Sequence, residues 1–134
     1  MIVVENEVTR YFWLGSGHTD AARAARRRDS DGHAPRLWQS EFRNGLYQHM
    51  QHRELSVSEA LRLAEVAEAD REEAIDSVAT TDVLRRTGET GPPASNCEYV
   101  ARTRDLGVTL VTGDETVVGR FPDPAVLLED CASP

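Results

Sequence analysis

Residues 106–114 place the strongest constraint on the fold of this 134-residue chain. Gly107 predicts a turn, and the apolar run at 108–111 that follows is typical of a strand buried inside a parallel sheet. Asp114 comes shortly after this run. Ligands of open parallel sheets bind at the carboxyl ends of the strands. The stretch therefore predicts a parallel sheet with Asp114 at its functional edge.

A second apolar run, residues 1–4, ends in the same way at an acid, Glu5. Apolar runs alternate with helical patterns along the chain, which predicts a parallel sheet with helices on both faces. We expect one domain, residues 1–134, with a three-layer α/β/α sandwich around a parallel sheet of about five strands. Right-handed crossovers would place Glu5 beside Asp114 at one edge of the sheet.

The individual elements follow from periodicity and from helix-start and helix-stop residues. Ser56 and Glu59 form a capping box. Thr19 or Asp20 is the expected N-cap of the second helix, and Gly88 is the expected stop of a later one. The expected strands are 1–5, 33–35, 75–78, 108–111 and 125–128; the expected helices are 6–14, 19–29, one from 37, 57–73, 81–87 and one from 95, with a turn or helix at 114–119 and a loop at 88–93.

The composition limits the possible functions. The chain has 23 acidic and 15 basic residues, a net charge of −8, and all its basic residues are arginines. This balance argues against a general nucleic-acid binder, which must neutralise phosphates, but a nuclease with a local basic rim remains compatible with it. No apolar run is long enough to span a membrane and no basic segment precedes the apolar start, so we expect a soluble cytoplasmic protein.

Three segments together are similar to PIN-domain ribonucleases, the nuclease fold of the VapC toxins of type II toxin–antitoxin pairs. These segments are residues 1–8, residues 33–44, and residues 96–101 followed by 110–114. They occur in the order and spacing of that family over nearly the whole chain. The resemblance implies an endoribonuclease that depends on Mg²⁺ or Mn²⁺, that forms a homodimer and that is paired with an antitoxin protein.

The resemblance also implies which residues form the site. The family's acid at the end of the first strand falls on Glu5, and the acid on the helix after the second strand falls on Glu41. Two further aspartate positions fall on Asn96 and Asp114. Glu5, Glu41 and Asp114 would hold the metal, because hard divalent cations bind oxygen ligands. The metal would then activate water and stabilise charge on the phosphate.

Two of these four positions depart from the family pattern. Glu5 is longer by one methylene than the aspartate usual there, and Asn96 carries no charge, which should weaken divalent binding. Glu7 replaces the usual asparagine two positions after the first acid, and it would either restore a charge or face solvent. Glu98 fits a capping box with Ser95 better than it fits a replacement for Asn96, because two positions on a helix point roughly 200° apart.

Other residues near these positions are less strongly indicated as parts of the site. Thr112 resembles a family position that hydrogen-bonds near the metal, and Glu115 is better placed than Glu98 to assist a cation. The candidates to contact an RNA backbone are Arg10, Arg23, Arg26, Arg27 and Arg43, and the alternative for each is a solvated side chain or one that complements a helix dipole.

Two functions remain open from the sequence. The first is an active or weakened ribonuclease. The second is a catalytically inactive PIN-fold module that binds RNA, an antitoxin-like protein or a second copy of itself. In toxin–antitoxin relatives an arginine of the antitoxin plugs the acidic site, because a guanidinium suits carboxylates.

Overall fold

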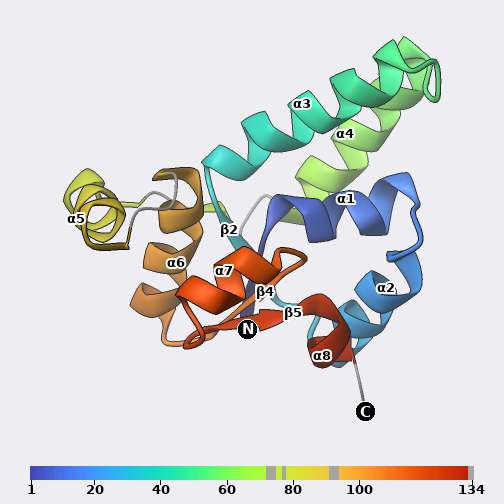
Figure 1. The fold of residues 1–134 in the computed structure, drawn as a ribbon. Coiled ribbons are helices and arrows are strands. Elements are labelled where there is room, and N and C mark those ends of the chain that lie inside the picture. The colour runs from blue at the N-terminus through green and yellow to red at the C-terminus, as the bar shows by residue number, and fades with distance from the viewer. Residues whose placement is uncertain (72–74, 77, 91–93, 133–134) are drawn as a thin grey trace.

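A computed structural model of the chain describes residues 1–71, 75–76, 78–90 and 94–132. Figure 1 shows strands in the centre with helices around them. The strands are β1 (Ile2–Val4), β2 (Gly32–Pro35), β3 (Ile75–Asp76), β4 (Thr109–Thr112) and β5 (Ala125–Leu127). The helices are α1 (Asn6–Leu14), α2 (Thr19–Arg28), α3 (Leu37–Gln51), α4 (Val57–Arg71), α5 (Thr80–Thr90), α6 (Ala94–Leu106), α7 (Glu115–Arg120) and α8 (Leu128–Ala132).

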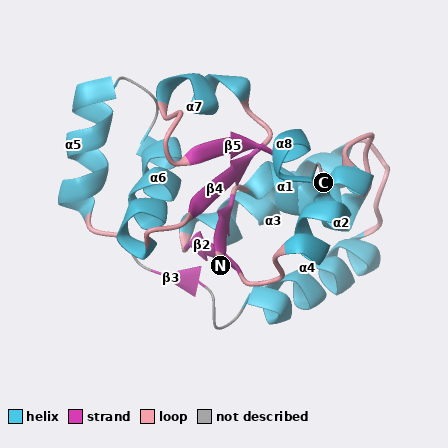
Figure 2. Ribbon diagram, turned by 90° about the horizontal axis from the view of Figure 1, so that it is seen from below, coloured by secondary structure: helices cyan, strands magenta, loops and turns pink. Residues whose placement is uncertain are grey.

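The sheet is parallel, as the sequence predicts. Its central four strands lie in the order β2-β1-β4-β5, and the two-residue β3 pairs with the outer edge of β2. β1 pairs with β4 over its whole length, with Val4 opposite Val111. Figure 2 shows these strands side by side between helices. This pairing confirms an α/β fold in which the carboxyl ends of β1 and β4 are neighbours.

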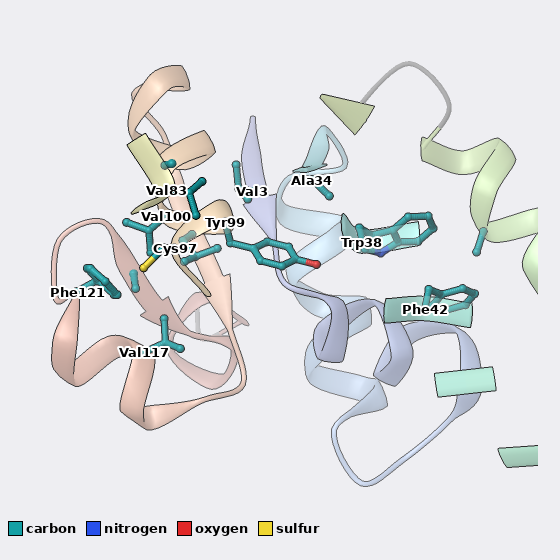
Figure 3. Close-up of a cluster of buried hydrophobic side chains, with 14 of the residues drawn as sticks. Val3, Ala34, Trp38, Phe42, Val83, Cys97, Tyr99, Val100, Val117 and Phe121 are labelled. Carbon is teal, nitrogen blue, oxygen red and sulfur yellow. The ribbon is translucent and has the colours of Figure 1, made fainter. Parts of the chain in front are cut away.

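Alternate residues of the central strands face two separate cores, as the two-residue period of a strand requires. Val3 and Leu110 belong to a large core that α3 and α6 cover. Val4 and Val111 belong to a smaller core beneath α1, α2 and α8. The large core contains Trp38, and Figure 3 shows it with Val3 and the neighbouring side chains. The sheet is thus covered on both faces by apolar helix surfaces.

Several helix boundaries confirm or correct the predicted ones. The capping box at the start of α4 is present, because the Ser56 and Glu59 side chains each accept a hydrogen bond of 3.1 Å from the other's backbone N–H. The predicted N-cap of α2 is wrong. Thr19 is already helical, and its hydroxyl donates to the Tyr11 carbonyl at 2.7 Å instead of capping.

Gly88 does not end a helix, because α5 continues to Thr90, so the loop predicted from position 88 is wrong for its first three residues. A helix tolerates an exposed glycine at a modest loss of stability. β3 covers Ile75–Asp76 of the strand predicted at 75–78; position 78 is outside the strand, and position 77 lies outside the described residues. α6 begins at Ala94, one residue before the predicted start, and the proposed cap by Ser95 lies outside the described side chains.

None of the described helices combines the length and apolar character needed to cross a bilayer.

Candidate functional site

The candidate site lies where β1 and β4 end. The backbone N–H of Glu5 donates to the carbonyl of Val111 at 3.0 Å, which ties the two strand ends together. The Glu5 residue is 4% exposed, and Thr112, the last residue of β4, is completely buried. The first acid predicted from the sequence therefore lies beside the strand end that leads to Asp114.

Two carboxylates meet at the hydroxyl of Thr112. Its Oγ1 lies 3.1 Å from Oε2 of Glu5 and 3.2 Å from Oε1 of Glu7. Glu7 Oε1 also accepts the backbone N–H of Gly113 at 3.2 Å. Thr112 has one hydroxyl hydrogen, so it can donate fully to only one of these carboxylates at a time. Glu7, which the sequence left undecided between the site and solvent, therefore faces the site.

This arrangement opposes ionisation of Glu5. Burial, with a further contribution from the neighbouring Glu7 carboxylate, raises the pKa of Glu5 to about 9, although the hydrogen bond from Thr112 acts in the opposite direction. Oε1 of Glu5 is buried and accepts no hydrogen bond. A buried carboxylate with a second, half-buried carboxylate beside it needs a proton or a cation to offset the repulsion between the two charges. The pair is therefore a place where positive charge is stabilised.

Glu41 approaches from α3 and is held by a buried tyrosine. The Tyr99 hydroxyl donates to Oε1 of Glu41 at 2.6 Å. Figure 3 shows the Tyr99 ring extending from α6 towards the side of the core that holds Trp38. Burial raises the pKa of Glu41, whereas the Tyr99 hydrogen bond lowers it. Burial and the Glu41 carboxylate raise the pKa of Tyr99, so the phenol remains a donor.

The four predicted site residues are not equivalent in the structure. Glu5 and Glu41 are close enough that each of them perturbs the same buried tyrosine. Asp114 follows β4 as expected, but its Oδ1 accepts the N–H of Thr116 at 2.8 Å and caps α7. Asn96 is half-buried near the start of α6 and takes no part in the hydrogen bonds of Glu5, Glu41 or Asp114.

Sequence reasoning missed Tyr99. The signal for it was present, because Tyr99 comes three residues after Asn96 and so lies on the same face of the helix. Glu98 also lies near the acids, since its charge raises the pKa of Glu41, while Glu115 is exposed.

Arg10 is the arginine most closely associated with these acids. Its charge lowers the pKa of Glu41. Its side chain passes over Gly45 of α3, where a methyl group would lie 2.5 Å from the Arg10 Cδ atom. Arg26 and Arg43 are instead paired with Asp70 and Glu68.

The donor set fits a hard divalent cation in kind and in charge. Glu5 and Glu7 offer adjacent carboxylates, and one buried Glu5 oxygen has no hydrogen-bond donor. Yet within the described ranges no three Asp, Glu, His or Cys side chains are grouped as a preformed metal site. Glu41 uses only Oε1 in its bond to Tyr99, and Asp114 uses only Oδ1 in its cap, so each has a second carboxylate oxygen for a cation.

No protein-family profile matches this sequence, and no curated protein matches it either. The likeness to PIN domains therefore depends on the residues of the three sequence segments alone.

Proposed function

We propose that the chain is a PIN-like endoribonuclease of the VapC toxin class, dependent on Mg²⁺ or Mn²⁺. One observation carries the proposal. Glu5 and Glu7 meet on Thr112 at the carboxyl ends of two parallel strands, and one Glu5 oxygen is buried without a donor. This is the edge at which parallel sheets bind ligands. The pair requires a compensating positive charge there, which a divalent cation would supply.

The proposed ligands of the cation are Glu5, Glu41 and Asp114, with Glu7 supplying the charge that Asn96 lacks. A bound Mg²⁺ or Mn²⁺ would activate water and stabilise negative charge on the phosphate. The other residues have positioning roles. Thr112 orients Glu5 and Glu7, and Tyr99 holds Glu41 at 2.6 Å. Asn96 offers an amide oxygen to a water molecule or to the cation.

The proposed substrate is RNA. Arg10 is the best candidate for a backbone phosphate contact, because its charge acts on Glu41 of the site. Arg26 and Arg43 already pair with carboxylates. Arg23 and Arg27 are exposed on α2 and remain secondary candidates. A guanidinium suits phosphate because it presents several donors in one plane.

The proposed protein partners are an antitoxin and a second copy of the chain. An antitoxin arginine would suit the acidic pair for the same electrostatic reason as a metal ion. For the homodimer, sedimentation velocity would distinguish a monomer of 14.9 kDa from a species of twice that mass.

A second candidate is the catalytically inactive binding module with the same fold. The observation that favours it is the absence of a preformed group of three metal-binding side chains in the described part of the chain. Asp114 is used as a helix cap and Glu41 is bonded to Tyr99. Such a protein would bind RNA or a protein segment at the acidic edge without cleaving it.

One experiment separates the two candidates. Cleavage of a structured RNA is measured with Mg²⁺ and with Mn²⁺ for wild type, Asn96→Asp and Asp114→Asn. The nuclease predicts cleavage that is lost in Asp114→Asn and increased at least several-fold in Asn96→Asp. If folded wild type and Asn96→Asp both leave the RNA intact, the nuclease proposal is wrong and the binding module replaces it.

A further inference from the structure

A small cavity lies on the other side of the sheet from Tyr99, among α1, α2 and the first strands. Its volume is about 50 Å³, and Val4, Val8 and Ala22 form part of its apolar wall. None of the acids of the candidate site lines it. The lining also includes the exposed residue Ser30, so the cavity reaches the surface at that end. It therefore constitutes a second place at which a ligand can enter.

A buried arginine forms the polar part of this cavity. Arg71, the last residue of α4, is 8% exposed. One terminal nitrogen donates to the carbonyl of Gly32 at 2.9 Å and the other to the hydroxyl of Thr9 at 3.1 Å. The guanidinium lies 5.5 Å from the centre of the Trp38 ring. These contacts fix its position, but the buried Nε has no hydrogen-bond acceptor.

No carboxylate of the described residues forms an ion pair with Arg71, although two lie in the cavity wall. Asp70 is bound by both terminal nitrogens of Arg26, at 2.8 and 2.5 Å. Asp29 accepts the N-terminal ammonium at 2.7 Å. Both acids are therefore already bound to other cationic groups, and neither bonds directly to Arg71, although the charge of Asp70 acts to raise the pKa of Arg71 against the effect of burial. Buried charges are ordinarily paired, because an isolated charge is strongly disfavoured in an apolar environment.

We propose that this cavity binds a small carboxylate anion against the Arg71 guanidinium. Two carboxylate oxygens match the planar donors of arginine. A short apolar substituent would contact Val8 and Ala22. The volume of the cavity limits the size of the ligand, because each water-sized group of a ligand needs roughly 10–15 Å³ of cavity volume. An anion of the size of acetate fits this limit, whereas a nucleotide does not. The proposal is independent of the nuclease at the acidic edge.

The test is a titration of ¹⁵N-labelled protein with sodium acetate, followed by the amide shifts of Thr9, Ala22 and Gly32. Sodium chloride at equal ionic strength, acetamide and sodium phosphate serve as comparison titrants, since acetamide has the shape of acetate without its charge. Ala22→Val fills the cavity while leaving Arg71 in place, and Arg71→Met removes the charge. Arg27→Gln, an exposed arginine of α2, is the matched control.

Saturable shifts with acetate that chloride and acetamide do not produce are the expected result. The dissociation constant should rise at least tenfold in Ala22→Val and stay unchanged in Arg27→Gln. Equal shifts with chloride, equal binding of acetamide, or undiminished acetate binding by folded Ala22→Val would each overturn the proposal. Phosphate binding more tightly than acetate at the same amides would overturn the assignment to a carboxylate. Failure of Arg71→Met to fold would not affect this test, because Ala22→Val decides it.

Discussion

At the scale of single residues, the candidate site is a set of carboxylates with unequal partners. Glu5 and Glu7 share the Thr112 hydroxyl, whereas Glu41 has Tyr99 to itself. This inequality separates their protonation behaviour. Burial and the neighbouring carboxylate raise the pKa of Glu5 to about 9, which keeps it protonated at neutral pH, while burial also raises the pKa of Glu41 but the Tyr99 donor partly opposes that rise. Environments of this kind assign different roles to chemically identical groups.

Replacing Glu5 by glutamine should change how stability depends on pH. Glu5 has a native pKa of about 9 against an ordinary value of 4.5, so the native state binds the additional proton between these values. Its contribution to stability is complete below the lower value and is lost as pH rises through the upper one. A difference of one between the native and unfolded pKa values corresponds to about 1.4 kcal/mol in the free energy of unfolding. Glu5→Gln should therefore gain stability relative to wild type as pH rises from 5 to 9.

Urea unfolding at several pH values, without divalent cations, measures this difference. Glu115→Gln provides the control, since Glu115 is exposed on α7. Parallel stability curves for wild type and Glu5→Gln would contradict the assigned pKa of Glu5.

Replacing Tyr99 by phenylalanine removes the donor to Glu41. The pKa of Glu41 should rise further, because the hydrogen bond that lowers it is lost. The expected loss of stability near neutral pH is about 1.5–3 kcal/mol, the range for a hydrogen bond to a charged group. A ¹³C-detected titration of the Glu41 carboxyl measures the pKa. Tyr47→Phe is the control, because Tyr47 is exposed and bonds only to Gln51 among the described contacts. An unchanged Glu41 pKa in Tyr99→Phe would refute the role given to Tyr99.

The positions of the acids could be predicted from the sequence, but their partners could not. Glu5 and Asp114 each follow an apolar run, and parallel pairing brings the ends of such runs together. Whether Asp114 faces a cation or caps α7 depends on side-chain rotamers and on the local turn, which residue spacing does not determine. The same is true of Glu7, whose direction depends on the start of α1.

At the scale of elements, the packing of α1 against α3 brings Arg10 towards Glu41. Gly45 permits this packing, because a Cβ there would lie 2.5 Å from the Arg10 side chain. Gly88 of α5 is exposed, and a Cβ at this position would have nothing within 4 Å. Gly45 is therefore required by close packing, whereas Gly88 lies in open space and has no such packing requirement.

Alanine at these two positions should have opposite effects. Alanine favours a helix over glycine by roughly 1 kcal/mol. Gly88→Ala should gain about this amount, whereas in Gly45→Ala the displacement of Arg10 outweighs the gain, for a net loss of about 1–2 kcal/mol. Thermal unfolding of both variants checks the prediction. A stabilised Gly45→Ala would mean that Arg10 moves aside freely, and that its position beside Glu41 is not fixed by α3.

The order and type of most elements followed from periodicity, while some helix ends did not. α8 was missed because the apolar run at its start reads continuously from β5. The structure divides that run at Leu128, which is fully buried in the smaller core with Ala22 and Ala25 of α2. A tertiary contact of this kind overrides the local pattern. The extension of α5 past Gly88 is a second case in which local signals were insufficient.

At the scale of the whole molecule, the parallel sheet separates two apolar cores, and each core supports a different candidate site. One core supports Tyr99 behind the acidic edge, and the other encloses the cavity lined by Arg71. The net charge of −8 opposes the binding of RNA, and a cation bound at the acidic edge would offset part of that charge. A divalent ion is thus the central requirement of the proposed nuclease.

Calorimetric titration of the protein with Mn²⁺ at pH 7.5 tests this requirement most directly. Measurements in two buffers of different ionisation enthalpy would reveal proton release. We expect saturable binding with the release of about one proton, because Glu5 must lose its proton to bind a metal. Binding should be strongly weakened in Glu5→Gln and retained in Glu115→Gln. Two results would contradict the proposed metal site. One is that the wild type does not bind Mn²⁺, and the other is that Glu5→Gln binds Mn²⁺ as tightly as the wild type.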